Sequence, residues 1–134
     1  MAINTYTVDF AINEVGDVSG REYVGVFQCK SRLSHLDRFK SDQIRRSLLG
    51  GVDPNAAGPI AQNMASAFAE ISIRIVEAPD WWKQSNSGVD LPDYNVVTEI
   101  YIKCMKIEQD AIDAIVKKAE AAKSNLDKPI IPQV

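Results

Sequence analysis

The chain has 134 residues, of which 46% are apolar and 25% charged, as in an ordinary globular protein. This length suits a single domain with a sizeable core. A net charge of −3 argues against a dedicated nucleic-acid-binding protein. The N-terminus lacks the pattern of a signal peptide, and no apolar stretch approaches the roughly 18 residues that a membrane span needs. We therefore expect an intracellular protein with no membrane partner.

Residues that commonly carry catalysis or bind metals are scarce. We expect Cys29 and Cys104 to be reduced and buried, because two cysteines make no disulfide framework in a chain of this length. The one histidine, His35, stands in the first turn of an expected helix, where a surface role is more typical than catalysis. Asp90 and Asp93 have the spacing to hold a cation, but turn and cap roles explain them better. We expect a protein that is not an enzyme and has no catalytic residue, metal or cofactor.

Two alternating runs within residues 5–30 predict an antiparallel β-hairpin. The second run places Tyr23, Phe27 and Cys29 on one face. Gly25 within it indicates a bulge or a close backbone approach. Because a lone hairpin is marginal in water, it must pack on helices or extend its edge with another chain. The first run places these residues on one face: Tyr6, Val8, Phe10 and Ile12.

Helical periodicity predicts three helices after the hairpin, at about 34–49, 56–77 and 93–123. The fold class is therefore α+β, an N-terminal antiparallel hairpin followed by three helices, the last one long. Residues 1–127 form one domain. The apolar, proline-bounded tail 128–134 follows as an extended segment suited to docking.

Capping residues support these helices. Ser34 and Asp37 resemble a capping box at the start of the first helix, and Gly50 ends it. Asp93 is placed to cap the third helix. That helix would be roughly 45 Å long at 1.5 Å per residue, which exceeds what a small core needs. Its C-terminal end is therefore expected to project or to meet a neighbour.

Charge is unevenly distributed along the chain. Residues 30–46 carry six cations against two acids, a local balance of +4, so the remainder carries −7. Such a segment indicates self-association between unlike faces, an acidic partner, or simply a solvated helix face. A small nucleic-acid-associated protein is a weaker alternative, and an enzyme subunit with its active groups in another chain is neither supported nor forbidden. The possible electrostatic patch comprises Lys30, Arg32, Arg38, Lys40, Arg45 and Arg46.

Both tryptophans lie in the connector between the second and third helices, at Trp81 and Trp82. Large aromatic side chains either close a core or anchor an interface. Since adjacent residues of an extended stretch point to opposite sides, we expect one ring in the core and the other against a neighbouring subunit. The predicted protein interface comprises Trp81, Trp82, Tyr94, Tyr101, Ile130 and Ile131.

The order of these elements resembles the small tail assembly chaperones of long-tailed bacteriophages. The resemblance covers roughly residues 20 to 115 and includes no catalytic signature. Five segments carry it: Gly20-Arg21-Glu22-Tyr23-Val24-Gly25-Val26-Phe27, Arg45-Arg46-Ser47-Leu48-Leu49-Gly50, Ala78-Pro79-Asp80-Trp81-Trp82, Gly88-Val89-Asp90-Leu91 and Asp93-Tyr94-Asn95-Val96-Val97.

The resemblance implies a self-associating protein without a cofactor that acts in the host cytoplasm during assembly. Members of that family bind the tape-measure protein, help to gather tail-tube subunits and leave before the particle matures. A frameshifted longer product is common among them. The long last helix and the 128–134 tail depart from the family pattern and favour an alternative, a minor structural protein that stays in the virion as a tail, neck or capsid-associated subunit.

Overall fold

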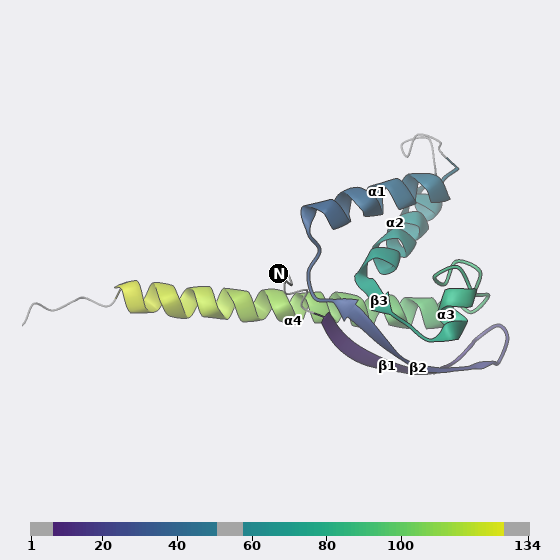
Figure 1. The fold of residues 1–134 in the computed structure, drawn as a ribbon, viewed down its shortest axis with the longest axis horizontal. Coiled ribbons are helices and arrows are strands. Elements are labelled where there is room, and N and C mark those ends of the chain that lie inside the picture. The colour runs from purple at the N-terminus through teal and green to yellow at the C-terminus, as the bar shows by residue number, and fades with distance from the viewer. Residues whose placement is uncertain (1–6, 51–57, 128–134) are drawn as a thin grey trace, which may run out of the picture.

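A computed structural model describes residues 7–50 and 58–127, with the side chains as far as residue 124. The chain has an α+β fold with an N-terminal antiparallel hairpin and a long last helix, as the sequence predicts (Figure 1). Tyr6 and the 128–134 tail lie outside the described residues. The elements in chain order are β1 Thr7–Val15, β2 Glu22–Lys30, α1 His35–Leu48, α2 Pro59–Arg74, β3 Ile75–Glu77, α3 Asp80–Gln84 and α4 Tyr94–Asp127.

The sheet has the order β1-β2-β3, and both pairings are antiparallel. Phe10 lies opposite Phe27, and their rings stack with centroids 5.3 Å apart. On the inner face Ile12, Tyr23 and Phe27 are buried and Phe10 is half-buried, whereas Val26 on the outer face is 62% exposed. The alternation predicted for the hairpin is therefore confirmed except at Val8, near the start of β1, which is 41% exposed.

The N-terminal half of α4 covers the inner face of the sheet (Figure 1). Val96, Ile100 and Cys104 are fully buried at spacings of four residues, which place them on one face of the helix. Beyond the body, all the side chains from residue 112 to 124 are exposed. The prediction that this helix projects past the core is confirmed.

Helices α1 and α2 pack on each other and stand away from the sheet (Figure 1). The capping box at the start of α1 is present, since the Ser34 hydroxyl accepts from the Asp37 N–H and the Asp37 carboxylate accepts from the Ser34 N–H. None of the 14 residues of α1 is buried. Phe39 on this helix is 71% exposed.

The region between α2 and α4 differs from the prediction. The second helix ends at Arg74 instead of residue 77, because Ile75–Glu77 pairs with β2 as β3. The tryptophan connector forms the five-residue helix α3, so there are four helices among the described residues instead of three. No helix in the described part of the chain is both long and apolar enough to cross a membrane.

Candidate functional site

The tryptophan helix α3 packs on the inner face of β2. The Trp82 side chain is 2% exposed and meets the Phe27 ring edge-on, with centroids 5.6 Å apart. Gly88 follows where the chain passes over this indole, at a φ of +87°. Any side chain there would be strained by the backbone and would overlap the Trp82 ring. Trp82 therefore belongs to the core of its own chain and is not available to a partner.

Trp81 is half-buried and also packs within the chain. Its ring meets Tyr23 at 5.0 Å and Phe27 at 5.6 Å between centroids. Its Nε1–H donates to the Val24 carbonyl oxygen at 3.0 Å, which satisfies an acceptor of β2 beyond the end of β3. The part of Trp81 that stays exposed is the only portion of the tryptophan pair that a partner can reach in this conformation.

The expectation that the two rings point to opposite sides is not met. They contact each other at right angles, with centroids 6.2 Å apart. The expectation assumed an extended connector, but these residues form a helix, in which neighbours are separated by about 100° at 3.6 residues per turn. Both indoles therefore reach the same strand.

Asp93 fastens the hairpin turn to the start of α4. Its side chain is fully buried and accepts four hydrogen bonds: from the backbone N–H groups of Val18 and Ser19, each at 2.8 Å, from the Ser19 hydroxyl at 2.6 Å and from the Tyr23 hydroxyl at 2.5 Å. Asn95 adds two bonds, accepting from the Asp17 N–H and donating to the Val15 carbonyl oxygen. We call Asp93, Asn95 and the turn they bind the turn lock.

Burial alone would raise the pKa of the Asp93 carboxyl, but the hydrogen bonds from Ser19, Tyr23 and Val18 outweigh it and hold this pKa well below its usual value of 3.8. The carboxylate that was predicted to cap the last helix therefore serves the hairpin turn. Burial, followed by the Asp93 hydrogen bond, raises the pKa of the Tyr23 hydroxyl, so this hydroxyl stays protonated and continues to donate.

An open pocket of about 300 Å³ lies between the hairpin turn, α3 and the loop that leads to α4. The exposed part of Trp81 lines it beside Tyr23, and the Arg21 guanidinium lies 5.4 Å from the centre of the Tyr23 ring. Asp90, in the loop that leads to α4, also lines the pocket. An aromatic surface with one cation and one acid at its rim is suited to a protein segment, because such groups recur at binding hot spots.

Tyr94 and Tyr101, both predicted at an interface, lie along a second pocket. This apolar groove of about 200 Å³ runs between α2 and α4 and includes Met64 and Phe68. Tyr101 is half-buried, whereas Tyr94 is 49% exposed. The structure thus brings these two tyrosines to one groove, about two helical turns apart on α4, but away from the Trp81 pocket.

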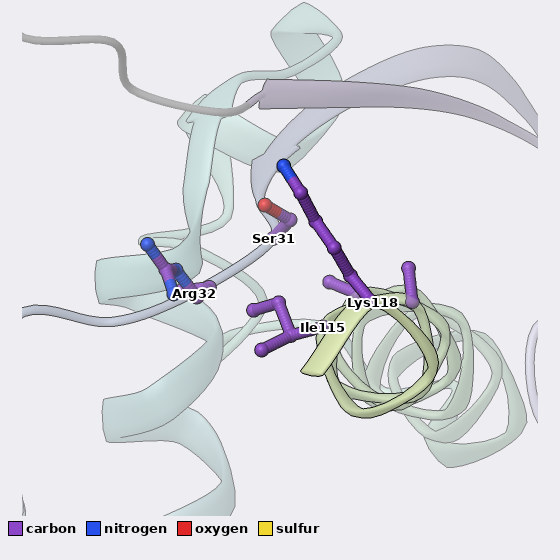
Figure 2. A pocket seen from close by; sticks show the side chains of 6 residues that line it. Ser31, Arg32, Ile115 and Lys118 are labelled. Carbon is purple, nitrogen blue, oxygen red and sulfur yellow. The ribbon is translucent and has the colours of Figure 1, made fainter. Parts of the chain in front are cut away.

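A third pocket, of about 320 Å³, lies where the segment after β2 passes over the projecting part of α4 (Figure 2). Ile115 and Lys118 point from the helix toward this segment, which contributes Ser31 and Arg32. Ala111 and Ala114 complete the lining. Small alanine side chains leave room at this point for a neighbouring element to approach.

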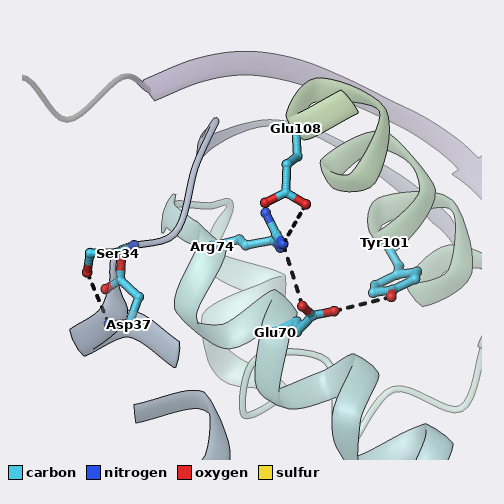
Figure 3. Close-up of polar contacts among 6 residues, drawn as sticks. All are labelled: Ser34, Asp37, Glu70, Arg74, Tyr101 and Glu108. Carbon is cyan, nitrogen blue, oxygen red and sulfur yellow. Dashed lines mark hydrogen bonds and ion pairs between the residues drawn. The ribbon is translucent and has the colours of Figure 1, made fainter. Parts of the chain in front are cut away.

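Sequence reasoning missed a buried polar network between α2 and α4 (Figure 3). The Arg74 side chain is 1% exposed, and its Nη2 lies 3.1 Å from a Glu108 oxygen and 3.5 Å from a Glu70 oxygen. The Tyr101 hydroxyl donates to the other Glu70 oxygen at 3.2 Å. The Arg74 Nε and Nη1 have no hydrogen-bond partner among the described residues. The apolar spacing of α2 did not indicate this residue, because Arg74 is the last residue of the helix and comes after the core position Ile71.

The possible electrostatic patch is divided by ion pairs. Lys30 pairs with Asp37 at 2.8 Å, while Arg45 and Arg46 share Asp42 at 2.5 and 3.0 Å. These pairs lower the charge that the segment presents outward. Among the described residues, no group of three His, Cys, Asp or Glu side chains is placed to hold a metal ion.

Cys29 and Cys104 are buried, as expected, and they meet as free thiols between β2 and α4. The hydrogen bond with Cys29, followed by burial, raises the pKa of the Cys104 thiol, so this thiol stays protonated. The two cysteines help to fill the interface between sheet and helix.

Comparisons of the chain with protein families, with curated proteins and with solved structures found no match.

Proposed function

We propose that this chain is a bacteriophage morphogenesis protein that acts by binding, not by catalysis. In this proposal it self-associates and holds other structural proteins, such as tape-measure or tail-tube subunits, as a tail assembly chaperone does. The observation that carries the proposal is the uncovered second half of α4, in which Ile112, Ile115 and Val116 are each more than 40% exposed. Contiguous exposed apolar side chains mark surfaces that bind proteins.

Energetics support a partner for this helix. A helical segment without tertiary contacts is marginal in water, and most helices in proteins are stabilised by packing of an apolar face. Ile112, Ile115 and Ala119 recur at spacings of three and four residues on the projecting part of α4. This repeat is suited to a seam against another helix.

The same surfaces suit the alternative, a minor structural protein resident in the virion. Pull-downs from infected cells, together with mass spectrometry of purified particles, distinguish the two. Capture of the tape-measure protein with absence from particles is expected for a chaperone, whereas a stoichiometric place in the particle would identify a structural subunit. Capture of neither tail nor capsid proteins would reject the proposal in both forms.

The replacement of Ile112 and Val116 by serine provides the matched variant. We expect the double variant to remain folded and to lose capture of its partner, because both side chains are exposed in the chain alone. A variant with Ile102→Ser, on the same helix and 52% exposed, is the control and should still capture the partner. A nucleic-acid role has less support, because Asp37 and Asp42 already pair with cations of the basic segment.

A further inference from the structure

The outer edge of β1 is open. In the sheet order β1-β2-β3, β1 has a strand on one side only among the described residues (Figure 1). A strand at an edge presents unpaired backbone N–H and C=O groups, and proteins block such edges with proline, charged side chains or a bulge. The nine residues Thr7–Val15 contain neither proline nor lysine, and their pairing with β2 runs without a register shift. Their charged residues are Asp9 and Glu14, so a second strand must keep these two acids apart from other acids.

We propose that β1 pairs with β1 of a second copy, antiparallel and about a two-fold axis at Ala11, so that two three-stranded sheets form one six-stranded sheet. The proposal rests on the self-association in the proposed function and assigns it a surface. It is an isologous contact, in which each residue of one copy meets the symmetry-related residue of the other.

The register follows from the two faces of the strand. Ala11 lies on the exposed face, while Phe10 and Ile12 lie on the core face. In a continuous sheet, core-facing residues must lie opposite core-facing residues, so only every second register is allowed. The register centred on Ala11 pairs all nine residues of the strand, and the neighbouring allowed registers pair fewer.

Charge is compatible with this register and disfavours two others. Centred on Ala11, the pairing places Asp9 opposite Asn13 of the other copy and Glu14 opposite Val8. Centring on Asp9 would set two carboxylates face to face, and a parallel pairing in register would align each acid with its own copy. Like charges directly opposite each other are destabilising, so the acids favour antiparallel pairing, and the number of paired residues selects Ala11 as its centre.

Apolar rows would continue across the new pairing. On the core face, Phe10 is only partly buried and would gain Ile12 of the other copy as its neighbour. Apolar cross-strand pairs such as Phe10 with Ile12 stabilise sheets. On the outer face, Ala11 would meet Ala11 of the other copy, while Val26 stays opposite Ala11 of its own chain.

The decisive experiment uses charge at the residue that meets itself. Ala11→Lys and Ala11→Glu should each weaken self-association, measured by analytical ultracentrifugation, by about tenfold or more, because each places like charges together on the axis. An equimolar mixture of the two variants should restore the dimer as a heterodimer. Ala11 is exposed, so both variants should keep the circular dichroism spectrum of the parent.

Val26→Lys is the matched control, on the same face and one strand further in, and it should associate like the parent. A cysteine pair provides a second measurement. Ala11→Cys should give a covalent dimer under mild oxidation, because opposed residues of antiparallel strands lie close enough for a disulfide, whereas Val26→Cys should not.

The outcomes separate this inference from the proposed function. If the protein self-associates and both Ala11 charge variants associate as the parent does, β1 is not the contact, and self-association through α4 remains. If the mixture of charge variants fails to restore a dimer that each variant has lost, the two-fold pairing at Ala11 is wrong. A chain that stays monomeric at its highest soluble concentration would contradict both proposals.

Discussion

The two halves of α4 have opposite surroundings. The first half lies between the sheet, α2 and α3, and its residues Val96, Ile100 and Cys104 are fully buried. The second half carries Ile112, Ile115 and Val116, each at least 42% exposed, and the segment Ser31–Arg32 lies beside Ile115. The same helix therefore stabilises the folded chain at one end and offers an apolar surface at the other. Substitutions in the first half should change stability, and those in the second should change association.

The largest difference is expected between a buried and an exposed aromatic side chain. Trp82→Ala should lower the free energy of unfolding by about 3–5 kcal/mol, because it removes a large buried ring and leaves a cavity. Phe39→Ala, at a position that is 71% exposed, should change it by less than about 0.5 kcal/mol. Urea unfolding followed by circular dichroism measures both. Equal losses at the two positions would show that the Phe39 side chain on α1 is buried in solution.

A smaller effect should appear as a pH dependence at the turn lock. The pKa of Asp93 is lowered in the folded chain, so its carboxylate stabilises the fold fully above about pH 5, and this contribution is lost as the pH falls toward the lowered pKa. Asp93→Asn keeps the shape but does not titrate. The unfolding free energy of the variant should therefore fall less steeply with acid than that of the parent, and parallel curves would contradict the assignment.

Trp81→Phe tests the junction between the core and the pocket. The phenyl ring keeps part of the packing on Tyr23 and Phe27 but cannot donate to the Val24 carbonyl oxygen. We expect a loss of about 0.5–1.5 kcal/mol, the usual net contribution of one hydrogen bond. Thermal unfolding monitored by near-UV circular dichroism gives the value. A loss as large as that of Trp82→Ala would place Trp81 fully in the core.

The smallest effect on the isolated chain is expected at the projecting end of α4. Ile112→Ser and Val116→Ser together should change the unfolding free energy of the monomer by less than about 1 kcal/mol, because exposed substitutions seldom exceed about 0.5 kcal/mol each. A dilution series that separates monomer from oligomer is needed, since association would add its own stabilisation. A large loss in the dilute monomer would mean that this half of α4 is covered by its own chain.

Periodicity predicted most of the fold. The alternation of the hairpin and the helical spacing at the start of α4 are local patterns that reflect burial, and the Ser34–Asp37 capping box is a local hydrogen-bond pattern. The spacing of α2 predicted the helix but not its buried face, since Ile60 is 77% and Met64 37% exposed. Gly25 was also informative, since a Cβ there would overlap the Pro79 ring that packs on it. The sequence therefore contained the α+β class, the order of the main elements and the length of the last helix.

The remaining features depend on contacts between distant segments. Ile75 continues the apolar spacing of α2, so nothing local indicated that the chain leaves the helix to pair with Cys29. The Asp93 carboxylate was expected to cap its own helix, but its hydrogen bonds go to residues 70 to 75 positions away. The sequence could not show whether Trp82 lies in the core or at an interface, because the same large aromatic side chain suits both places.

The turn lock also orders events in time. The hairpin turn and Asp93 are separated by 74 to 75 positions, so the acceptor for Val18 and Ser19 is added to the chain long after the strands that it fastens. Contacts of such wide separation form late, since a long loop must close before they can stabilise anything. Until then the hairpin turn lacks the hydrogen bonds to Asp93. The turn is therefore fastened only once the start of the helix that covers the sheet has reached it.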